Sequence, residues 1–270
     1  MRTCVVLQPG YLPWLGFFEQ MAQADEFVLL DDVQYDKHGW RNRNRVKGPA
    51  GPVWLTVPVR AGGLDRPRIC DVEIDATQRR WAAKHLGTLR ACYTGAPHFD
   101  RLYPQMEALL RHNWRLLVEL DIALLALLCE RLALRRPIHR SSTLGVAGDR
   151  CARLVEICRG IGCDRYYSGG AARDYLDVAL FERAGIEVAF QDYGHPQYPQ
   201  RHGSFIPQLS IVDLLFNCGP ASLGILTGRE PSLAPSGAKQ SGADQSEADQ
   251  SEADQSGADQ SRDREGATAS

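Results

Sequence analysis

Two short apolar segments separated by one amphipathic segment restrict most strongly what the start of this chain can fold into. Residues 4–7 form an apolar run that ends at Gln8-Pro9-Gly10, and residues 27–30 form a second run that ends at Asp31-Asp32. Between them, residues 14–24 place Leu15, Phe18 and Met21 on one helical face. This order of strand, helix and strand is typical of a βαβ unit and predicts a parallel sheet.

The rest of the first 228 residues extends this pattern. Residues 53–59 and 69–74 predict a pair of strands after a loop at 34–52, and a helical periodicity covers about 77–135. Further strands are expected near Ile138, at 164–167 and at 186–191. Further helices are expected at 149–160 with Asp149 as N-cap, at 175–184, and at 211–217 with a capping box of Ser210 and Asp213. We therefore predict an α/β protein with an open, mainly parallel sheet flanked by helices and a helical insertion.

The last forty or so residues differ in composition from the rest of the chain. After Leu233 there is no aromatic, Leu, Ile or Val side chain, and the unit Ala-Asp-Gln-Ser recurs at 243, 248, 253 and 258. Such a segment cannot bury enough apolar surface to offset its chain entropy. We expect one domain over residues 1–228 and a disordered, low-complexity acidic tail over 229–270.

Composition restricts the classes of partner. A formal net charge of −2 gives no overall basic field of the kind that nucleic-acid binding requires. The eight cysteines show no CxxC or Cys/His spacing of a metal site. No signal-peptide core precedes Gln8, and the longest apolar run, 122–129, is too short to span a bilayer. We expect a cytoplasmic protein without nucleic-acid partner, metal site or membrane span.

Polar residues follow the predicted strands at the edge where such sheets bind ligands. They are Gln8 with Tyr11, Asp31 with Asp32, and Ser168-Gly169-Gly170 followed by Arg173 and Asp174. The carboxyl ends of parallel strands share one edge, so the first two groups should converge. Two adjacent carboxylates can accept a proton or bind a cationic amine. The alternative is that either acid starts a turn or caps backbone amides.

The segment from Lys37 to Lys47 carries five Lys or Arg side chains and predicts a local anion site. In an extended segment, the alternation of Arg and Asn from Arg41 to Arg45 would place the guanidinium groups on one face. Arginine forks suit phosphate or carboxylate, and Trp40 can stack on a base, sugar or acyl group. An ordinary solvated loop is the alternative. Tyr198 and Phe205, near the end of the predicted domain, are candidate pocket walls.

Several motifs, in order along residues 4–220, resemble the WbqC-like protein family. The motifs are Leu7-Gln8-Pro9-Gly10-Tyr11-Leu12-Pro13-Trp14-Leu15-Gly16, Leu30-Asp31-Asp32-Val33-Gln34, Arg41-Asn42-Arg43, Lys47-Gly48, Trp54-Leu55-Thr56-Val57-Pro58-Val59, Ser168-Gly169, Arg173-Asp174-Tyr175-Leu176, and the block from Gly203 to Asn217. Members commonly carry a histidine before the Gln-Pro pair, and Leu7 stands there in this chain.

The resemblance implies a role in bacterial surface-polysaccharide biosynthesis, with transfer of a glycyl or other aminoacyl group to an amino sugar. On this interpretation Asp31 or Asp32 is the catalytic base or ammonium anchor. Substrate would be bound by Gln8, Tyr11, Trp40, Arg41, Asn42, Arg43, Lys47, Ser168, Arg173, Asp174, Tyr198 and Phe205. The expected ligand is a phosphate-bearing sugar or acyl donor, or a carrier protein that presents the acyl group; the cofactor is unknown.

Two other functions stay open. One is an ATP-dependent ligase or nucleotidyl transferase, although the sequence has no P-loop or GxGxxG motif. The other is a binding module without catalysis that presents a nucleotide sugar or carrier to a pathway partner.

Overall fold

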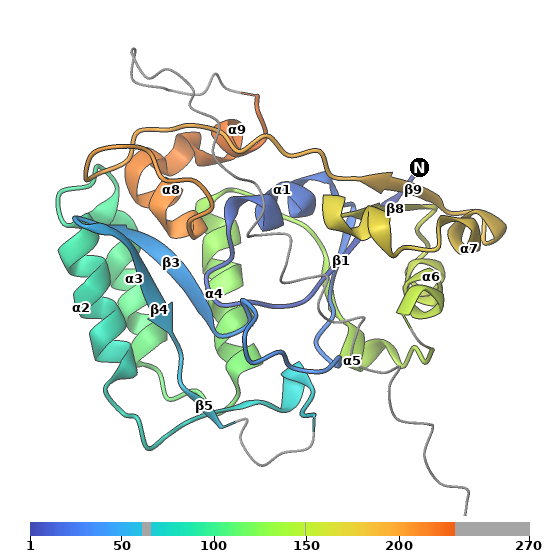
Figure 1. The fold of residues 1–270 in the computed structure, drawn as a ribbon, viewed down its shortest axis with the longest axis horizontal. Helices are drawn as coiled ribbons and strands as arrows, with labels where there is room; N and C mark the ends of the chain where they lie inside the picture. Colours follow the sequence, from blue (N-terminus) through green and yellow to red (C-terminus); the bar gives the residue numbers. More distant parts are fainter. Residues whose placement is uncertain (61–65, 149, 230–270) are drawn as a thin grey trace, which may run out of the picture.

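A five-stranded parallel sheet forms the centre of the fold. The computed structural model describes residues 1–60, 66–148 and 150–229. The strands are β1 (Thr3–Leu7), β2 (Glu26–Leu29), β7 (Ile138–Arg140), β8 (Arg165–Ser168) and β9 (Glu187–Phe190), in the order β7-β2-β1-β8-β9 (Figure 1). Every neighbouring pair is parallel. The predicted α/β class is confirmed; the Asp149 cap and the tail from 230 lie outside the described residues.

Alternation along the strands divides the core between the two faces of the sheet. Cys4 and Val6 of β1 pack into a cluster with α6 (Arg150–Gly160) and α7 (Val178–Arg183). Val5 of β1 and Phe27 of β2 belong instead to the larger cluster, which contains α1 (Leu15–Gln23) and the helices of the insertion. Successive strand residues point to opposite faces, so both faces of the strands are covered.

The strand order reverses at β1. The chain adds β2 and then β7 on one side of β1, and β8 and then β9 on the other. The carboxyl ends of β1 and β8 therefore lie at the topological switch point, where open α/β sheets commonly bind ligands. Gln8 follows β1 there and Ser168 ends β8.

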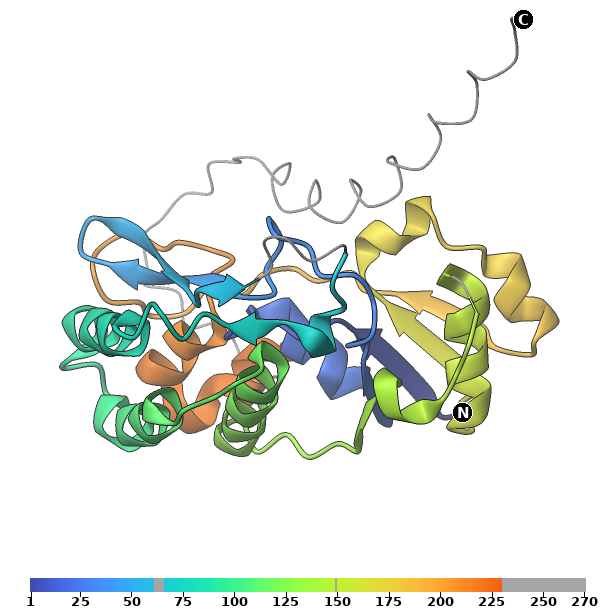
Figure 2. The same cartoon turned by 90° about the horizontal axis from the view of Figure 1, so that it is seen from below.

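A β-hairpin and three helices build the other half of the molecule. The hairpin consists of β3 (Arg43–Gly48) and β4 (Gly51–Thr56), and the helices are α2 (Trp81–Tyr93), α3 (Phe99–Arg111) and α4 (Leu117–Arg131). Figure 2 shows the hairpin on one side of these helices. The predicted helical insertion is thus present, and α4 lies between the hairpin half and the sheet in Figure 1.

The predicted strand pair at 53–59 and 69–74 is largely wrong. β4 pairs with β3, which lies inside the segment predicted as a loop. A tight turn at 49–50 joins the two strands, and the φ of Gly51 directly after it is 122°. Only the short β5 (Val59–Arg60) and β6 (Glu73–Ile74) pair as expected, and a 3-10 turn, η1 (Ile69–Asp71), takes the start of the second segment. The polar character of β3 hid a strand that buries one face only.

The remaining elements are short. They are α5 (Ser141–Leu144), η2 (Gly170–Asp174), α8 (Ile211–Cys218), η3 (Gly219–Ala221) and α9 (Ser222–Leu226). The Ser210 hydroxyl caps α8 as predicted, since it accepts from the Val212 amide. The Asp213 carboxylate was predicted to complete a capping box, and that prediction is wrong, because it accepts hydrogen bonds from two tyrosines instead.

Across residues 1–60, 66–148 and 150–229, no helix has both the length and the apolar character needed to cross a bilayer. All eight cysteines are free thiols, and six of them are buried.

Candidate functional site

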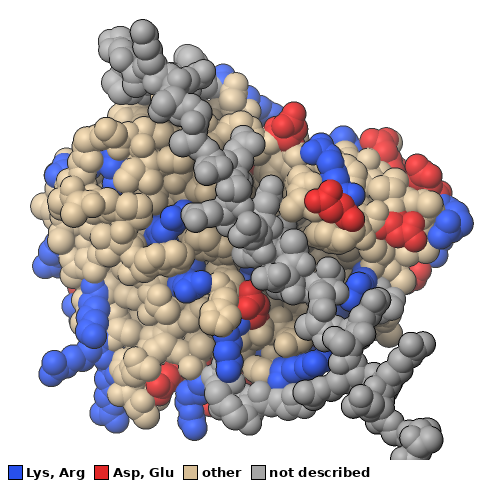
Figure 3. Space-filling model, viewed as in Figure 1, with Lys and Arg blue, Asp and Glu red and all other residues tan. Residues whose placement is uncertain are grey.

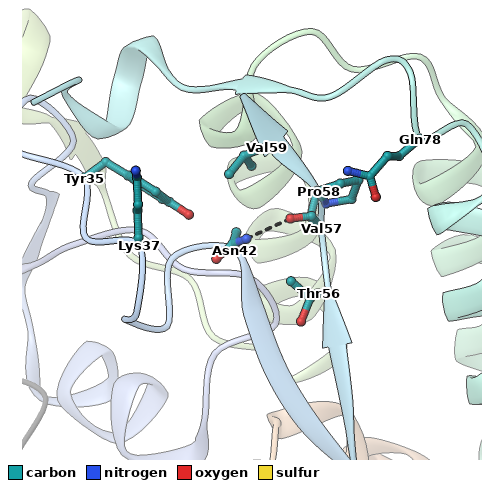
Figure 4. A pocket seen from close by; sticks show the side chains of 8 residues that line it. All are labelled: Tyr35, Lys37, Asn42, Thr56, Val57, Pro58, Val59 and Gln78. Carbon is teal, nitrogen blue, oxygen red and sulfur yellow. Dashed lines mark hydrogen bonds between the residues drawn. The ribbon is translucent and has the colours of Figure 1, made fainter. Parts of the chain in front are cut away.

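An open hollow of about 440 Å³ lies where the hairpin meets the loop after β2. Tyr35 and Lys37 line one side, and the chain from Thr56 to Val59 with Gln78 lines the other (Figure 4). Asn42 lies between them and donates from Nδ2 to the Val57 carbonyl over 2.8 Å. The hollow therefore combines an amide, a phenol, an ammonium group and a short apolar strip, which suits a small polar ligand.

The hairpin face next to this hollow carries two stacked indoles and two guanidinium groups. Trp40 and Trp54 stack with ring centroids 5.3 Å apart, and Arg43 lies 4.9 Å over the Trp54 ring. Arg45, which faces Trp54 in the strand register, lies 5.6 Å from both rings. Trp54 is 47% exposed. Arg43 and Arg45 thus lie together at the indole pair, whereas Arg41 Nη1 donates to the Pro9 carbonyl. Stacked guanidinium groups keep N–H donors available for anions.

Charged side chains on the surface differ between the hairpin half and the sheet half of the molecule. On the face shown in Figure 3, Lys and Arg side chains predominate over the hairpin half, and Asp and Glu gather over the half that contains α6 and α7. The near-neutral total charge therefore conceals a locally basic region around the hollow. A local field of this kind attracts anionic ligands without the overall basic charge of a nucleic-acid binder.

The turn after β1 meets the arginine-rich loop, as the sequence predicts. The Tyr11 amide donates to the Arg41 carbonyl over 3.0 Å, and Arg41 Nη1 donates to the Pro9 carbonyl over 3.3 Å. A Cβ atom on Gly10 would stand 2.9 Å from the Trp40 carbonyl oxygen, so only glycine allows this close approach. Residues thirty positions apart thus form one wall of the site.

A buried hydrogen-bonded pair supports this wall. The Tyr11 hydroxyl lies 2.9 Å from His85 Nδ1, and His85 Nε2 lies 3.2 Å from the Thr56 carbonyl. A carbonyl only accepts, so Nε2 carries the imidazole proton and Tyr11 donates to Nδ1. Burial lowers the pKa of His85 to about 4, so the ring stays neutral. Tyr11 is fully buried, and we reassign it from substrate contact to support of Thr56 in the hollow wall.

Asp121, on the second turn of α4, is a buried carboxylate without hydrogen-bond donors. The residue is 2% exposed, and within the described part of the chain neither oxygen has a hydrogen-bond partner. Burial raises its pKa well above the ordinary value, and the charge of Arg41 acts in the opposite direction. Its charge also acts on Tyr11 and on Tyr35, which lines the hollow. Strongly perturbed, unsatisfied acids of this kind are typical of functional sites.

Asp31, predicted as a catalytic acid, is held by several donors. Its side chain is fully buried and accepts from Arg140 Nε over 2.7 Å. The Ser142 amide and hydroxyl each donate over 2.9 Å, and the Ser141 hydroxyl lies at 3.2 Å. The carboxylate therefore caps the start of α5. These contacts support the capping alternative for Asp31 and leave no lone pair directed at a substrate.

Asp32 lies beside it and is also paired. It accepts from the Ser141 hydroxyl and forms an ion pair with Arg153. Burial alone would raise the pKa of Asp32, but these two partners outweigh it and lower the pKa below its ordinary value. A carboxylate with a lowered pKa is a weak base, so a role in orienting the sheet edge fits Asp32 better than proton abstraction.

Lys47 is buried in a network that holds the chain after Tyr198. Its ammonium group donates to Gln200 Oε1 over 3.1 Å and to the carbonyls of Gly203 and Ser204. The Tyr93 hydroxyl bridges the Lys47 amide and the Asp213 carboxylate, which also accepts from Tyr198 over 2.9 Å. Burial lowers the pKa of Lys47, and Asp213 opposes this.

These contacts reassign two predicted binding residues, Lys47 and Tyr198, to the support of the site. Phe205 packs edge-on against Tyr198 at 5.3 Å between ring centroids and belongs to the same cluster.

Replacing Lys47 by Met is expected to lower the free energy of unfolding by about 1–3 kcal/mol, because the Gln200 side chain and the carbonyls of Gly203 and Ser204 lose a charged hydrogen-bond donor. Urea denaturation at pH 7 measures the change. Lys84→Met, on the exposed face of α2, is the control and should change the free energy by less than about 0.5 kcal/mol. Equal stability of both variants would contradict the role of the Lys47 network.

The remaining predicted residues lie in the sheet half, away from the hairpin. Ser168 is buried and its hydroxyl lies 3.4 Å from the Tyr166 hydroxyl. Arg173 stacks 5.2 Å over Phe190, and Asp174 is exposed at the end of η2. In both Figure 1 and Figure 2 this segment lies on the opposite side of the molecule from β3 and β4. The predicted residues therefore do not form one pocket.

Gln8, unlike the other predicted residues of the sheet half, lies near the arginine-rich loop, because it adjoins the turn that contacts Arg41. Its Oε1 atom is buried and has no hydrogen-bond donor within the described residues. Among the same residues, no group of three or more His, Cys, Asp or Glu side chains could hold a metal ion.

Sequence reasoning missed Asp121, Tyr35, Gln78 and Trp54 as site residues, and it named Arg45 only as part of the basic segment. A usable signal existed for Asp121, since it follows the first turn of an otherwise apolar segment from Leu116 to Cys129, in which Glu119 is the other acid. A charge at that position of a buried helix is costly and therefore informative. No comparable signal identified Gln78, which reaches the hollow from the turn before α2.

The fold and this site define an α/β protein with a doubly wound parallel sheet and a basic, aromatic hollow beside its carboxyl edge. Comparison with protein families matches residues 8–225 to the WbqC-like protein family. The chain belongs to this family. It is also 36% identical over 221 residues to "Uncharacterized protein Rv1507c" of Mycobacterium tuberculosis (strain ATCC 25618 / H37Rv), covering 81% of this chain and 95% of the relative. No solved structure matches significantly.

Proposed function

We propose that this protein is an amide-forming transferase that moves an aminoacyl group, glycyl in the simplest case, to an amine of a sugar or similar small molecule. The pathway would be surface-polysaccharide or related biosynthesis. Membership of the WbqC-like family supports this setting. The observation that carries the proposal is the hollow beside the arginine and tryptophan face of the hairpin.

Each part of this region fits one part of such a reaction. The guanidinium groups of Arg43 and Arg45 suit the phosphate of a nucleotide-linked or carrier-linked substrate. Asn42, Tyr35 and Gln78 offer the hydrogen-bonding groups that orient a sugar in the hollow. Binding two substrates side by side would supply much of the rate enhancement through orientation alone.

The chemical step is an acyl transfer. The acceptor nitrogen attacks the acyl carbonyl carbon, a C–N bond forms, and the bond from that carbon to the donor's leaving group breaks. The nitrogen gives up one proton to a base, and the leaving group departs with the bonding electron pair. An activated ester, thioester or acyl phosphate would supply such a leaving group.

The test uses the full-length protein with a glycyl thioester or glycyl-tRNA as donor and a nucleotide-linked amino sugar as acceptor. Mass spectrometry should detect the glycyl amide of the acceptor. Arg45→Gln should raise the KM for the phosphate-bearing substrate about tenfold, because a charged hydrogen bond is lost. Glycine-dependent release of AMP or pyrophosphate from ATP would instead identify a ligase. Binding of the nucleotide sugar without any product would identify a binding module.

A further inference from the structure

We infer that the outer face of the hairpin binds the nucleoside diphosphate of a nucleotide sugar. The base stacks on Trp54, the two phosphates contact Arg43 and Arg45, and the attached sugar enters the hollow. The inference rests on the proposed function and names the acceptor class more narrowly, as a sugar linked to a nucleotide rather than to a carrier.

The first argument is that the two arginines of this face have no acidic partner. Arg140 and Arg153 each pair with an aspartate, but within the described residues neither Arg43 nor Arg45 forms a salt bridge. Arg43 donates to the His38 carbonyl, and the Arg45 guanidinium contacts the two indoles. Alternate residues of a strand lie about 7 Å apart on one face, so two uncompensated positive charges are neighbours here. A diphosphate supplies the negative charge for both.

The second argument is the exposed indole beside these charges. Trp54 is 47% exposed, although Trp40 and both arginines contact its ring. Its neighbours Val53 and Leu55 pack into the core on the other face of the hairpin, so the strand holds the ring outward. A fixed aromatic ring next to arginine is the combination on which nucleotides bind, because every base has a flat face and every phosphate is an anion.

The third argument is the order of these groups along the hairpin. Arg45 faces Trp54 in the strand register, and Arg43 faces Thr56. Thr56 and Asn42, which precedes Arg43, both line the hollow (Figure 4). The indole, the guanidinium groups and the hollow therefore follow one another in that order. A nucleotide sugar has its base, phosphates and sugar in the same order.

The opposite end of this face is closed. Lys47, two residues beyond Arg45, donates to the carbonyls of Gly203 and Ser204, so the chain at 203–204 lies over that end. A ligand on Trp54 can extend only toward the hollow, whose volume of about 440 Å³ is sufficient for one sugar ring. The face therefore suits a single nucleotide with its sugar, and it lacks the long basic track of a nucleic-acid binder.

The test is isothermal titration calorimetry of the full-length protein at pH 7 with UDP-N-acetylglucosamine, dTDP-glucose and GDP-mannose. Stacking alone selects no particular base, so all three are needed. At least one should bind tenfold or more tightly than its free nucleoside, which lacks phosphate, and than inorganic pyrophosphate, which lacks the base. These factors are the size expected for charged hydrogen bonds and for one base–indole stack.

Two variants assign the two halves of the nucleotide. Trp54→Leu should weaken binding of the nucleotide sugar about tenfold and remove its advantage over pyrophosphate, whereas Trp54→Phe should keep most of the affinity. Arg45→Gln should also weaken binding about tenfold and remove the advantage over the nucleoside. Arg159→Gln, on α6 in the sheet half, should bind as the wild type does. Circular dichroism verifies that each variant is folded.

Absence of binding by all three nucleotide sugars at millimolar concentration, or affinity unchanged in both Trp54→Leu and Arg45→Gln, would overturn the inference. Tighter binding of a single-stranded oligonucleotide than of any nucleotide sugar would also overturn it. The titrations need no acyl donor. Binding that depends on base and phosphate, without any glycyl product, would keep the site and reject the transferase. Glycyl transfer to a nucleotide-linked amino sugar with an unchanged KM in Trp54→Leu would do the reverse.

Discussion

Replacing Asp121 by Asn is expected to stabilise the protein by about 1–2 kcal/mol at pH 7. The folded state holds this carboxylate without hydrogen-bond donors in the described chain, and burial of a charge without such partners is costly. The amide is nearly isosteric and uncharged, although Arg41 then loses an opposite charge, which limits the gain. Thermal and urea denaturation measure the effect, and a lower stability of the variant would contradict this account of Asp121.

The pH dependence of that gain provides a separate check. The pKa of Asp121 is raised in the folded state, so the folded protein keeps this proton at pH values where the unfolded chain has lost it. By linkage, this residue makes the wild-type protein less stable as pH rises above the unfolded pKa of about 4. The advantage of Asp121→Asn should be near its minimum at about pH 4 and below and should grow toward pH 7. An advantage that is constant with pH would contradict the raised pKa.

Replacing Asp31 by Ala should have the opposite and larger effect, a loss of about 3–5 kcal/mol in the free energy of unfolding. The change leaves the guanidinium group of Arg140 and the donors of Ser141 and Ser142 without this hydrogen-bond acceptor. Much of the typical total stability of a domain would be lost. Urea denaturation at pH 7 gives the value, with the exposed Asp174→Ala as a control that should change little.

The Asp31 result bears directly on how activity data should be interpreted. Asp31 and Asp32 were predicted as the catalytic pair, and a double variant that loses turnover could do so by unfolding. Asp32→Asn is the informative change, because Asp32 lies nearer the surface and its partners can be solvated. If Asp32→Asn keeps wild-type stability and loses glycyl transfer, the original catalytic assignment of Asp32 gains support.

Asp31 and Asp121 differ in how their buried carboxylates are compensated. Asp31 has a donor for each of its oxygens, and Asp121 has none in the described chain. Both are buried, so burial alone does not distinguish them. The number of hydrogen-bond partners does, because it states whether the fold or a ligand must compensate for the desolvation of the charge.

Local sequence patterns determined the parallel sheet, the βαβ unit and the helical insertion. Apolar runs such as 4–7 and 27–30 are too short and too buried to be anything but strands once a helix separates them. The β3 strand escaped prediction because its outer face carries Arg43 and Arg45, and an alternating polar strand resembles a loop.

Only the tertiary structure decided which polar groups are satisfied. Asp31, Asp32 and Asp213 look alike in sequence, and each has a partner 109 to 121 positions away, namely Arg140, Arg153 and Tyr93. Hydrogen-bond partners across such separations are fixed by packing rather than by local propensity. The sequence by itself therefore determined where most of the elements form, and the packing of distant elements decided which carboxylates have hydrogen-bond donors among the described residues.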